Sequence, residues 1–249
     1  MSIPKSLTEN LPHDKPILVL GGCGFLGSVV VRHLVEAGSK VRVFDLAKQN
    51  PVRLRPVLDR IDLREGDYTK EHDLGAALKG VHTVLHFIGT TIPETSMNDI
   101  GFDIRTNVLP TIRLLELAKE RGLEKLIFAS SGGTVYGIPH DQKPLKESDP
   151  TNPISAYGVS KLMVEKFIQL FSFNFGLPYV IFRFANPYGP HQSSEGMQGA
   201  VSVFLSKAER NEPITIWGDG STVRDYIYED DLAEAVLSVL ARTHLTGIF

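Results

Sequence analysis

A glycine-rich turn between a short apolar run and a long amphipathic stretch restricts the fold of this 249-residue chain most strongly. The segment ILVLGGCGFLGSVVVRHLVEAG, residues 17–38, groups its glycines either as Gly22, Gly24 and Gly27 or as Gly21, Gly24 and Gly27. Both groupings are typical of a strand, a tight turn and a helix in direct succession. Small residues let the backbone approach a phosphate, to which the helix N-terminus offers free N–H groups. A strand-to-helix turn without a ligand remains the alternative.

Short apolar runs alternate with longer stretches of helical period from residue 16 onwards. The runs predicted to be buried strands are 16–20, 40–44, 83–87, 125–129 and 178–184. The stretches predicted to be helices are 25–38, 104–122 and 155–176, each ending on glycine. This alternation predicts an α/β fold with a doubly wound parallel sheet of the Rossmann type, whose ligands bind beyond the carboxyl ends of the strands.

The pattern loosens after about residue 184, where turn-forming residues become frequent. We therefore expect a flexible tail over 1–14, a dinucleotide-binding Rossmann domain over 15–184, and a smaller, partial substrate lobe over 185–249. A final helix near 230–241 is expected to pack back on the sheet domain.

Composition excludes some classes of function. The net charge of −3 gives no reason to expect a nucleic-acid or membrane partner. The N-terminus lacks the apolar core of a signal peptide, and the single cysteine, Cys23, fits a reducing compartment. We therefore expect a cytoplasmic protein. His86 is predicted to be structural, because no second ligand stands at metal spacing, and no metal is expected.

Two acidic residues support a dinucleotide site. Asp45 ends the second strand, eighteen positions after Gly27, where a carboxylate can accept hydrogen bonds from an adenosine ribose. Such a carboxylate would repel a 2′-phosphate, which favours NAD over NADP. Asp67 stands in REGDYT, after a further strand that is not among the runs above, where the acid or its neighbouring backbone could meet the adenine. It could instead be a turn or N-cap aspartate before the helix expected at 71–78.

Tyr157 and Lys161 stand four residues apart on one face of a predicted helix, within SAYGVSK. A tyrosine hydroxyl ionises near pH 10, but a nearby ammonium group favours the phenolate and lowers its pKa. The pair therefore suits the removal of a proton from an alcohol. An exposed tyrosine beside a solvated lysine would give the same spacing.

Several motifs occur together in a recognisable order. They are GGCGFLG, Asp45, Asp67, VLHFIG, SSGGTVYG, YGVSK, FRFANPYGP and GDGSTVRDYIYEDDLAEA. Over residues 16–249 the chain resembles the extended short-chain dehydrogenase/reductase family, in its NAD-dependent epimerase/dehydratase branch. It looks most like nucleotide-sugar 4-epimerases of the UDP-galactose 4-epimerase type.

The resemblance implies roles in binding NAD. The pyrophosphate would be held by Gly21, Gly24, Phe25, Leu26 and Gly27. The ribose would meet Asp45, and the adenine Asp67 and Tyr68. The remaining cofactor contacts would come from Phe87, Ile88, Gly89, Asn107, Ser130, Tyr157 and Lys161. Asn107 could instead be a polar helix residue that faces solvent.

The resemblance also implies catalytic and substrate-binding roles. Tyr157 would be the base and Lys161 its partner. Asn186 and Thr134 would contact the nucleotide sugar, and Arg224 a phosphate of its diphosphate, for which a planar guanidinium is suited. An ion pair with a neighbouring acid is the alternative for Arg224.

The chain departs from the family pattern where many epimerases carry a catalytic hydroxyl. That position is Gly132, so we predict that Ser131 supplies the hydroxyl, with Ser130 and Thr134 as substitutes. Dehydratases of the family carry an acid pair where this chain has Gly133 and Thr134, which disfavours dehydration.

We therefore expect NAD-dependent epimerisation at C4 of UDP-glucose/UDP-galactose or an N-acetyl analogue. A nucleotide-sugar reductase or dehydrogenase, or a non-catalytic NAD-binding module, remains an alternative. The resemblance implies a homodimer that pairs helices 98–121 and 155–174 as a four-helix bundle. It also implies a sugar-binding lobe that continues beyond Phe249, so the lobe is expected to be incomplete or reduced.

Overall fold

The computed structural model describes residues 11, 13–138, 143–194, 199–216 and 218–249. Most of the predicted tail, 1–10 and 12, lies outside the described residues. The described strands of the main sheet are all parallel, in the order β3-β2-β1-β4-β5-β6-β9. They are β1 (Ile17–Leu20), β2 (Val41–Asp45), β3 (Ile61–Glu65), β4 (Thr83–His86), β5 (Lys125–Ser131), β6 (Tyr179–Phe184) and β9 (Gly247–Ile248). The predicted doubly wound α/β fold is confirmed.

Strand β1 shows why these runs lie inside the sheet. All four of its residues are buried, and because side chains alternate along a strand, Ile17 and Val19 join the core on one face while Leu18 and Leu20 join the other. The first face is covered by α2 (Phe25–Glu36) and α9 (Glu229–Leu240).

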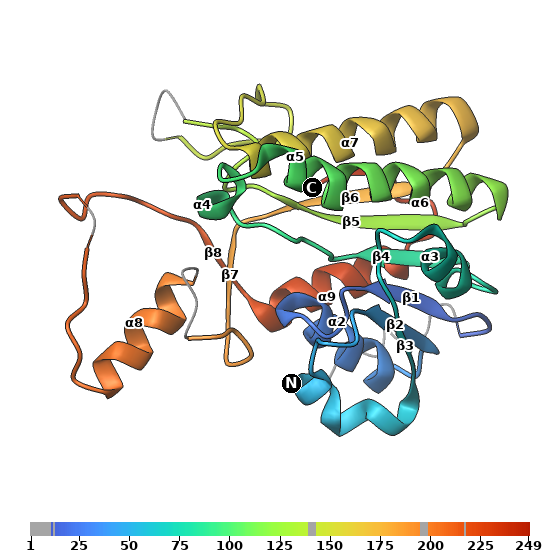
Figure 1. Cartoon of the computed structure of the whole chain (residues 1–249), viewed down its shortest axis with the longest axis horizontal. Coiled ribbons are helices and arrows are strands. Elements are labelled where there is room, and N and C mark those ends of the chain that lie inside the picture. Colours follow the sequence, from blue (N-terminus) through green and yellow to red (C-terminus); the bar gives the residue numbers. More distant parts are fainter. Residues whose placement is uncertain (1–10, 12, 139–142, 195–198, 217) are drawn as a thin grey trace.

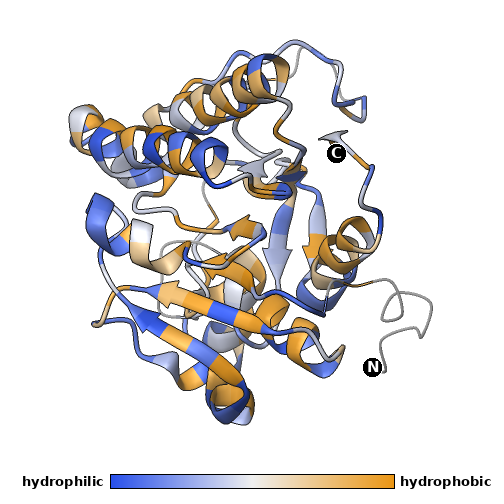
Figure 2. Cartoon of the chain, turned by 90° about the vertical axis from the view of Figure 1, so that its right-hand side faces the viewer, coloured by the Kyte–Doolittle hydropathy of each residue, from blue (hydrophilic) through white to orange (hydrophobic). Residues whose placement is uncertain are grey.

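The other face is covered by helices on the opposite side of the sheet, as Figure 1 shows. They are α3 (Glu71–Ala77), α6 (Leu109–Glu120) and α7 (Ala156–Phe175). In Figure 2 some strands show long hydrophobic stretches, and the helices carry both hydrophobic and hydrophilic residues. Each helix therefore buries an apolar stripe and leaves a polar face.

The second predicted helix is divided, although one continuous element was expected there. Residues 98–121 contain α5 (Ile100–Asp103), a π-helical turn η2 (Ile104–Val108) and then α6. A π-turn inserts an extra residue into the helical hydrogen-bond pattern and often marks a functional site. Apolar periodicity does not reveal such a turn, because the flanking helices keep their own period.

The remaining elements are short. They are the 3₁₀ helix η1 (Pro51–Arg60), α4 (Pro93–Ser96), α8 (Ala200–Glu209), β7 (Asn186–Tyr188) and β8 (Tyr226–Tyr228). The sequence analysis missed η1 and β9. Pro56 inside η1 lacks the N–H that a regular helix needs, and the two-residue β9 is too short to give a pattern.

The predicted lobe stands apart from the sheet. Strands β7 and β8 pair with each other, and α8 has no buried residue, consistent with its place at the side of the molecule in Figure 1. Helix α9 then packs against α2, and Phe249 donates its N–H to Ile181 of β6. Residues 229–249 therefore return to the main sheet, whereas the sequence analysis counted 185–249 as the lobe and expected only the helix near 230–241 to pack back.

The described residues lack two kinds of feature. None of their helices is long and apolar enough to cross a membrane. No group of three or more His, Cys, Asp or Glu side chains among them could hold a metal ion.

We expect Gly27→Ala to lower the free energy of unfolding by about 1–3 kcal/mol, as overpacking does. A Cβ at this position would lie 2.2 Å from the carbonyl oxygen of Gly21, so the added atom outweighs the better helix propensity of alanine. Urea denaturation measures the effect. Gly89→Ala is the control, since a Cβ there meets no atom within 4 Å. Equal stability of the two variants would contradict the close packing of the turn.

Candidate active site

The turn between β1 and α2 forms a cradle of backbone at the carboxyl edge of the sheet. Gly21 has a φ of +79°, and a Cβ on it would lie 3.0 Å from the backbone nitrogen of Ile88. Gly24 is the N-cap of α2, whose first turn carries neither a side-chain cap nor an acidic residue. The N-terminal N–H groups of α2 are thus free of competing side chains and suit a pyrophosphate.

The other residues predicted to contact the cofactor along this edge are partly exposed. Phe25 and Leu26 begin α2 and are half-buried. Phe87 and Ile88 follow β4 and are also half-buried, and Gly89 is exposed. The structure therefore brings these residues to one accessible edge of the sheet.

Asp45 lies against the glycine turn. Its carboxylate accepts hydrogen bonds from the backbone N–H groups of Cys23 and Leu46, each at 2.9 Å. Burial raises the pKa of Asp45, and these two N–H groups oppose the rise. Burial, together with Asp45, also raises the pKa of the Cys23 thiol to about 12, so that it stays neutral.

Asp67 and Tyr68 differ from each other in their surroundings. Asp67 accepts hydrogen bonds from the backbone N–H and the hydroxyl of Thr69, which makes it a turn residue. The Tyr68 side chain is buried, and its hydroxyl lies 3.0 Å from both His86 Nε2 and Thr111 Oγ1. A contact between Tyr68 and an adenine, as predicted, would therefore fall to its backbone.

The predicted catalytic pair lines a narrow cavity at the start of α7. Ser155 caps this helix by accepting a hydrogen bond from Gly158, which fixes the position of its first turns. The Lys161 ammonium donates a hydrogen bond to the carbonyl of Ala129 at 2.8 Å and lies 5.6 Å from the centre of the Tyr157 ring. Both residues are half-buried, and Lys161 is directed towards β5.

Burial sets the ionisation of this pair. It raises the pKa of Tyr157 to about 12, and it lowers the pKa of Lys161 to about 8. A hydrogen bond with the side chain of Ser131 acts in the opposite direction on Tyr157 and lowers its pKa. Of the candidate hydroxyls, Ser131 is thus the one that contacts the tyrosine.

Gly132 explains why the usual hydroxyl position is empty in this chain. A Cβ there would lie 2.6 Å from the carbonyl oxygen of Arg183 in β6, so no side chain fits. Ser130, one residue before Ser131, points elsewhere and donates its hydroxyl to Glu165. The Thr134 hydroxyl is buried without a hydrogen-bond partner among the described residues.

The π-turn η2 presents Asn107 to the same cavity. Its Nδ2 donates to Thr90 Oγ1 at 2.7 Å and to Asp103 Oδ1 at 3.0 Å, and its Oδ1 accepts from the backbone N–H of Thr90. Asn107 is therefore held in place rather than solvated. Asp103, which the sequence analysis missed, is fully buried and also lines the cavity.

Two of the predicted substrate residues, Asn186 and Arg224, lie in the lobe. Asn186 donates a hydrogen bond to the backbone carbonyl of Asp225 at 2.8 Å, and its Oδ1 lies 4.0 Å from a Cβ built on Gly133. Arg224 is exposed, and no carboxylate among the described residues pairs with it. Its expected alternative, an ion pair with Asp225, is absent from this part of the chain, and the guanidinium stays free for a phosphate.

A buried ion pair supports the active-site strand and was also missed from sequence. Arg183 of β6 and Glu165 of α7 pair at 2.7 Å, with side chains only 4% and 0% exposed. Arg183 also donates to the Tyr136 hydroxyl at 3.0 Å. The pair therefore links β6, α7 and the loop after β5 behind the catalytic pair.

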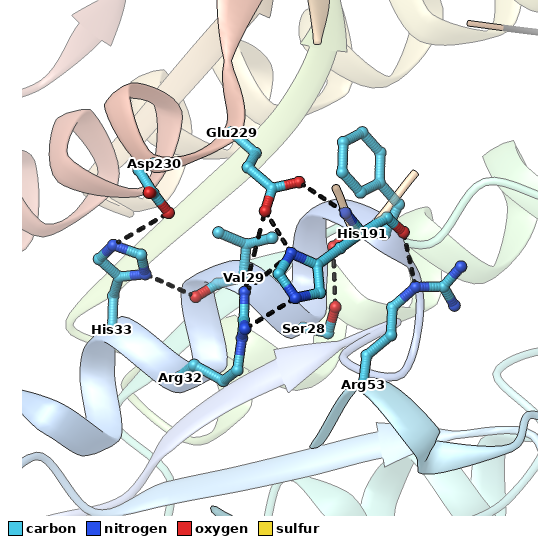
Figure 3. Close-up of polar contacts among 9 residues, drawn as sticks. Ser28, Val29, Arg32, His33, Arg53, His191, Glu229 and Asp230 are labelled. Atoms are coloured by element: carbon cyan, nitrogen blue, oxygen red, sulfur yellow. Dashed lines mark hydrogen bonds and ion pairs between the residues drawn. The ribbon is translucent and has the colours of Figure 1, made fainter. Parts of the chain in front are cut away.

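His191 anchors the loop that leads from β7 towards α8 (Figure 3). Its ring contacts Glu229 at the start of α9 and the Arg32 guanidinium on α2. Its backbone carbonyl accepts a hydrogen bond from Arg53 at 2.7 Å. The cluster therefore fastens the base of the lobe to the helices that cover one face of the sheet.

The residues present fit an NAD molecule. The glycine turn leaves no room for additional side chains at Gly21 and Gly27, and the N-terminus of a 12-residue helix faces the same edge. Asp45 supplies an acceptor beside the turn, and Tyr157 and Lys161 lie in a cavity at the carboxyl edge, where α/β sheets bind ligands.

Comparison with known proteins agrees with this geometry. Residues 17–247 match the NAD dependent epimerase/dehydratase family, and the chain belongs to that family. It is similar to a putative UDP-glucose 4-epimerase of Methanocaldococcus jannaschii, at 37% identity over 227 residues that make up 90% of this chain and 73% of the relative. The predicted family resemblance is confirmed.

Two further proteins are similar to this chain. A dTDP-4-dehydro-6-deoxyglucose reductase of Escherichia coli is 32% identical over 231 residues, covering 90% of this chain and 72% of the relative. The crystal structure of a Thermus thermophilus UDP-glucose 4-epimerase in complex with NAD matches with a TM-score of 0.85 at 32% identity. It covers 94% of this chain and 76% of that one.

Proposed function

We propose that this protein is an NAD-dependent isomerase that inverts C4 of a nucleotide sugar, UDP-glucose/UDP-galactose or an N-acetyl analogue. The observation that carries the proposal is the placement of Tyr157, Lys161 and Asn107 around one cavity, with Ser131 hydrogen-bonded to the tyrosine. Ile88, which also lines this cavity, lies beside Gly21 of the glycine turn.

The chain's own residues remove the proton of the sugar 4-hydroxyl and later return it. Tyr157 takes the proton of the sugar 4-hydroxyl, and the Lys161 ammonium and the Ser131 hydroxyl stabilise the phenolate that this requires. Bound NAD supplies a hydride acceptor at C4. Arg224 binds the diphosphate, and Asn186 and Thr134 contact the nucleotide sugar. The 4-keto sugar would then turn in the site and regain the hydride at C4 on its other face, while Tyr157 returns the proton to the 4-oxygen.

Incubation with UDP-, GDP- and dTDP-sugars, without added cofactor, tests the proposal. NAD-loaded protein is expected to interconvert the C4 epimers of a UDP-sugar and to leave the amount of NADH unchanged. If the protein binds NAD but converts none of the sugars, it is a non-catalytic module. Because this chain is similar to a reductase of Escherichia coli, reduction of a nucleotide sugar is the second candidate function. Such an enzyme would consume NADH as it reduces a keto-sugar.

Ser131→Ala is expected to lower kcat by about 10- to 100-fold, because a hydrogen bond to a charged group contributes about 1.5–3 kcal/mol. Loss of the bond raises the pKa of Tyr157 further, so the acidic limb of the pH–rate profile moves to higher pH. Ser130→Ala is the matched control, since that hydroxyl bonds to Glu165 instead. A larger rate loss in Ser130→Ala would reverse the assignment.

We propose a cytoplasmic location, where the thiol of Cys23 stays reduced.

We also propose a homodimer that forms through α6 and α7. The two helices pack side by side, and α7 exposes Leu170 and Phe173, at 51% and 89%. Phe173→Asp is expected to shift the protein from dimer to monomer in light-scattering chromatography. A wild-type monomer at micromolar concentration would contradict the dimer.

A further inference from the structure

Asp103 is a buried carboxylate that the proposed reaction does not yet use. It ends α5 and has no exposed surface. Its Oδ1 accepts hydrogen bonds from the Thr91 hydroxyl and, at 3.0 Å, from Asn107 Nδ2. Its Oδ2 is buried with no hydrogen-bond partner among the described residues. Burial of a carboxylate oxygen without a partner is costly, so a further interaction is to be expected.

The same cavity contains a cation, the Lys161 ammonium, whose positive charge no neighbouring carboxylate in the described part of the chain contacts directly. Asp103, Tyr157 and Lys161 all line it. The Lys161 ammonium has three hydrogens, and its one hydrogen bond among the described residues goes to the neutral carbonyl of Ala129. Burial lowers the pKa of Lys161 to about 8, which brings its titration close to neutral pH.

The neighbouring charges on the packed elements do not balance this lysine. Glu165, one turn further along α7, is already paired with Arg183 of β6. His86 of β4 also lines the cavity, but burial lowers its pKa to about 3, so it is neutral. Asp103 forms no ion pair within 4 Å among the described residues. It is therefore the negative charge in the cavity that remains uncompensated.

We propose that Asp103 is the electrostatic partner of Lys161 across this cavity, a positioning residue that keeps the lysine in its ammonium form. The two side chains do not touch, so the attraction acts through the poorly solvated cavity, where charges interact more strongly than in water. Asp103 and Glu165 both favour the charged lysine against the effect of burial. This role of Asp103 rests on the proposed function only in its expected effect on the reaction rate.

The charge of Asp103 has a second effect that acts on Tyr157. It raises the pKa of the tyrosine directly, which opposes the phenolate. Loss of Asp103 therefore makes Tyr157 easier to ionise while Lys161 is charged, but it makes Lys161 lose its proton at a lower pH. The alkaline limb of the kcat profile is then expected to move to lower pH.

Titration of Lys161 in the Asp103→Asn protein tests the inference without substrate or cofactor. Asparagine keeps the shape and an oxygen for the donors of Thr91 and Asn107, but removes the charge. Lysine labelled with ¹³C at Cε reports protonation by NMR, and Lys161→Arg assigns the signal. The wild-type midpoint is expected near 8, and that of Asp103→Asn about one pH unit lower.

Two further variants serve as controls for the titration of Lys161. Glu94→Gln removes an exposed carboxylate from the neighbouring helix α4 and is expected to leave the midpoint unchanged. Asp103→Ser, a smaller uncharged replacement, is measured if Asp103→Asn does not fold, with circular dichroism to establish folding. An unchanged Lys161 midpoint in a folded, uncharged variant overturns the proposal. A lowered midpoint in a protein that epimerises no sugar would support it and reject the proposed function instead.

Discussion

Tyr157→Phe is expected to lower the rate of C4 epimerisation by about 10²- to 10⁴-fold, the usual contribution of a general acid–base group. The substitution removes one hydroxyl and keeps the ring, which packs near the Lys161 ammonium and inside the cavity. Binding of NAD and of the UDP-sugar is therefore expected to persist. Initial rates measure the first effect, and calorimetric titration with each ligand measures the second.

Tyr179→Phe is the matched control for this loss. Tyr179 begins β6, at the edge of the sheet opposite the site, and is half-buried. Its hydroxyl is expected to contribute nothing to the rate. Unchanged epimerisation in Tyr157→Phe, with the control equally active, would remove Tyr157 from the mechanism.

Arg183→Met is expected to lower the free energy of unfolding by about 3–5 kcal/mol, because it leaves the charge of Glu165 buried without its partner. The two side chains are 4% and 0% exposed, so water cannot replace the lost ion pair. Chemical denaturation measures the change. Activity is expected to fall with stability, since Glu165 also holds Ser130 of the active-site strand.

The double variant Arg183→Met with Glu165→Met separates the lost pair from lost packing. Replacing both partners of a buried pair by apolar side chains is often neutral, so stability is expected to recover most of the loss. A double variant as unstable as the single one would show that packing, rather than the unpaired charge, accounts for the effect.

Features that depend on local sequence could be predicted. The turn with Gly21 and Gly27 follows from the need for a backbone without side chains, and α7 ends at Gly176, whose φ is +71°. Tyr157 and Lys161 share a face because they are four residues apart on that helix. That Ser131 rather than Ser130 supplies the hydroxyl stays a prediction, which the hydrogen bond of Ser131 with Tyr157 and that of Ser130 with Glu165 support.

Features that depend on distant contacts could not be predicted. Asp103 enters the cavity because a π-turn follows α5, and nothing in the apolar pattern indicates that turn. The partner of Glu165 lies 18 residues away on another element, and the contact of His191 with Arg32 spans 159 residues. Such charges look like ordinary surface residues until the fold brings them together.

Transfer of deuterium at C4 tests the central claim most directly. NAD-loaded protein is incubated with a UDP-sugar that carries deuterium at C4, and the product is isolated and examined by mass spectrometry and NMR. If the hydrogen leaves C4 and returns to it within one closed site, the epimer is expected to retain the deuterium at C4. An epimer that has exchanged its C4 deuterium with solvent, or deuterium recovered in free NADH without an epimer, would contradict the account.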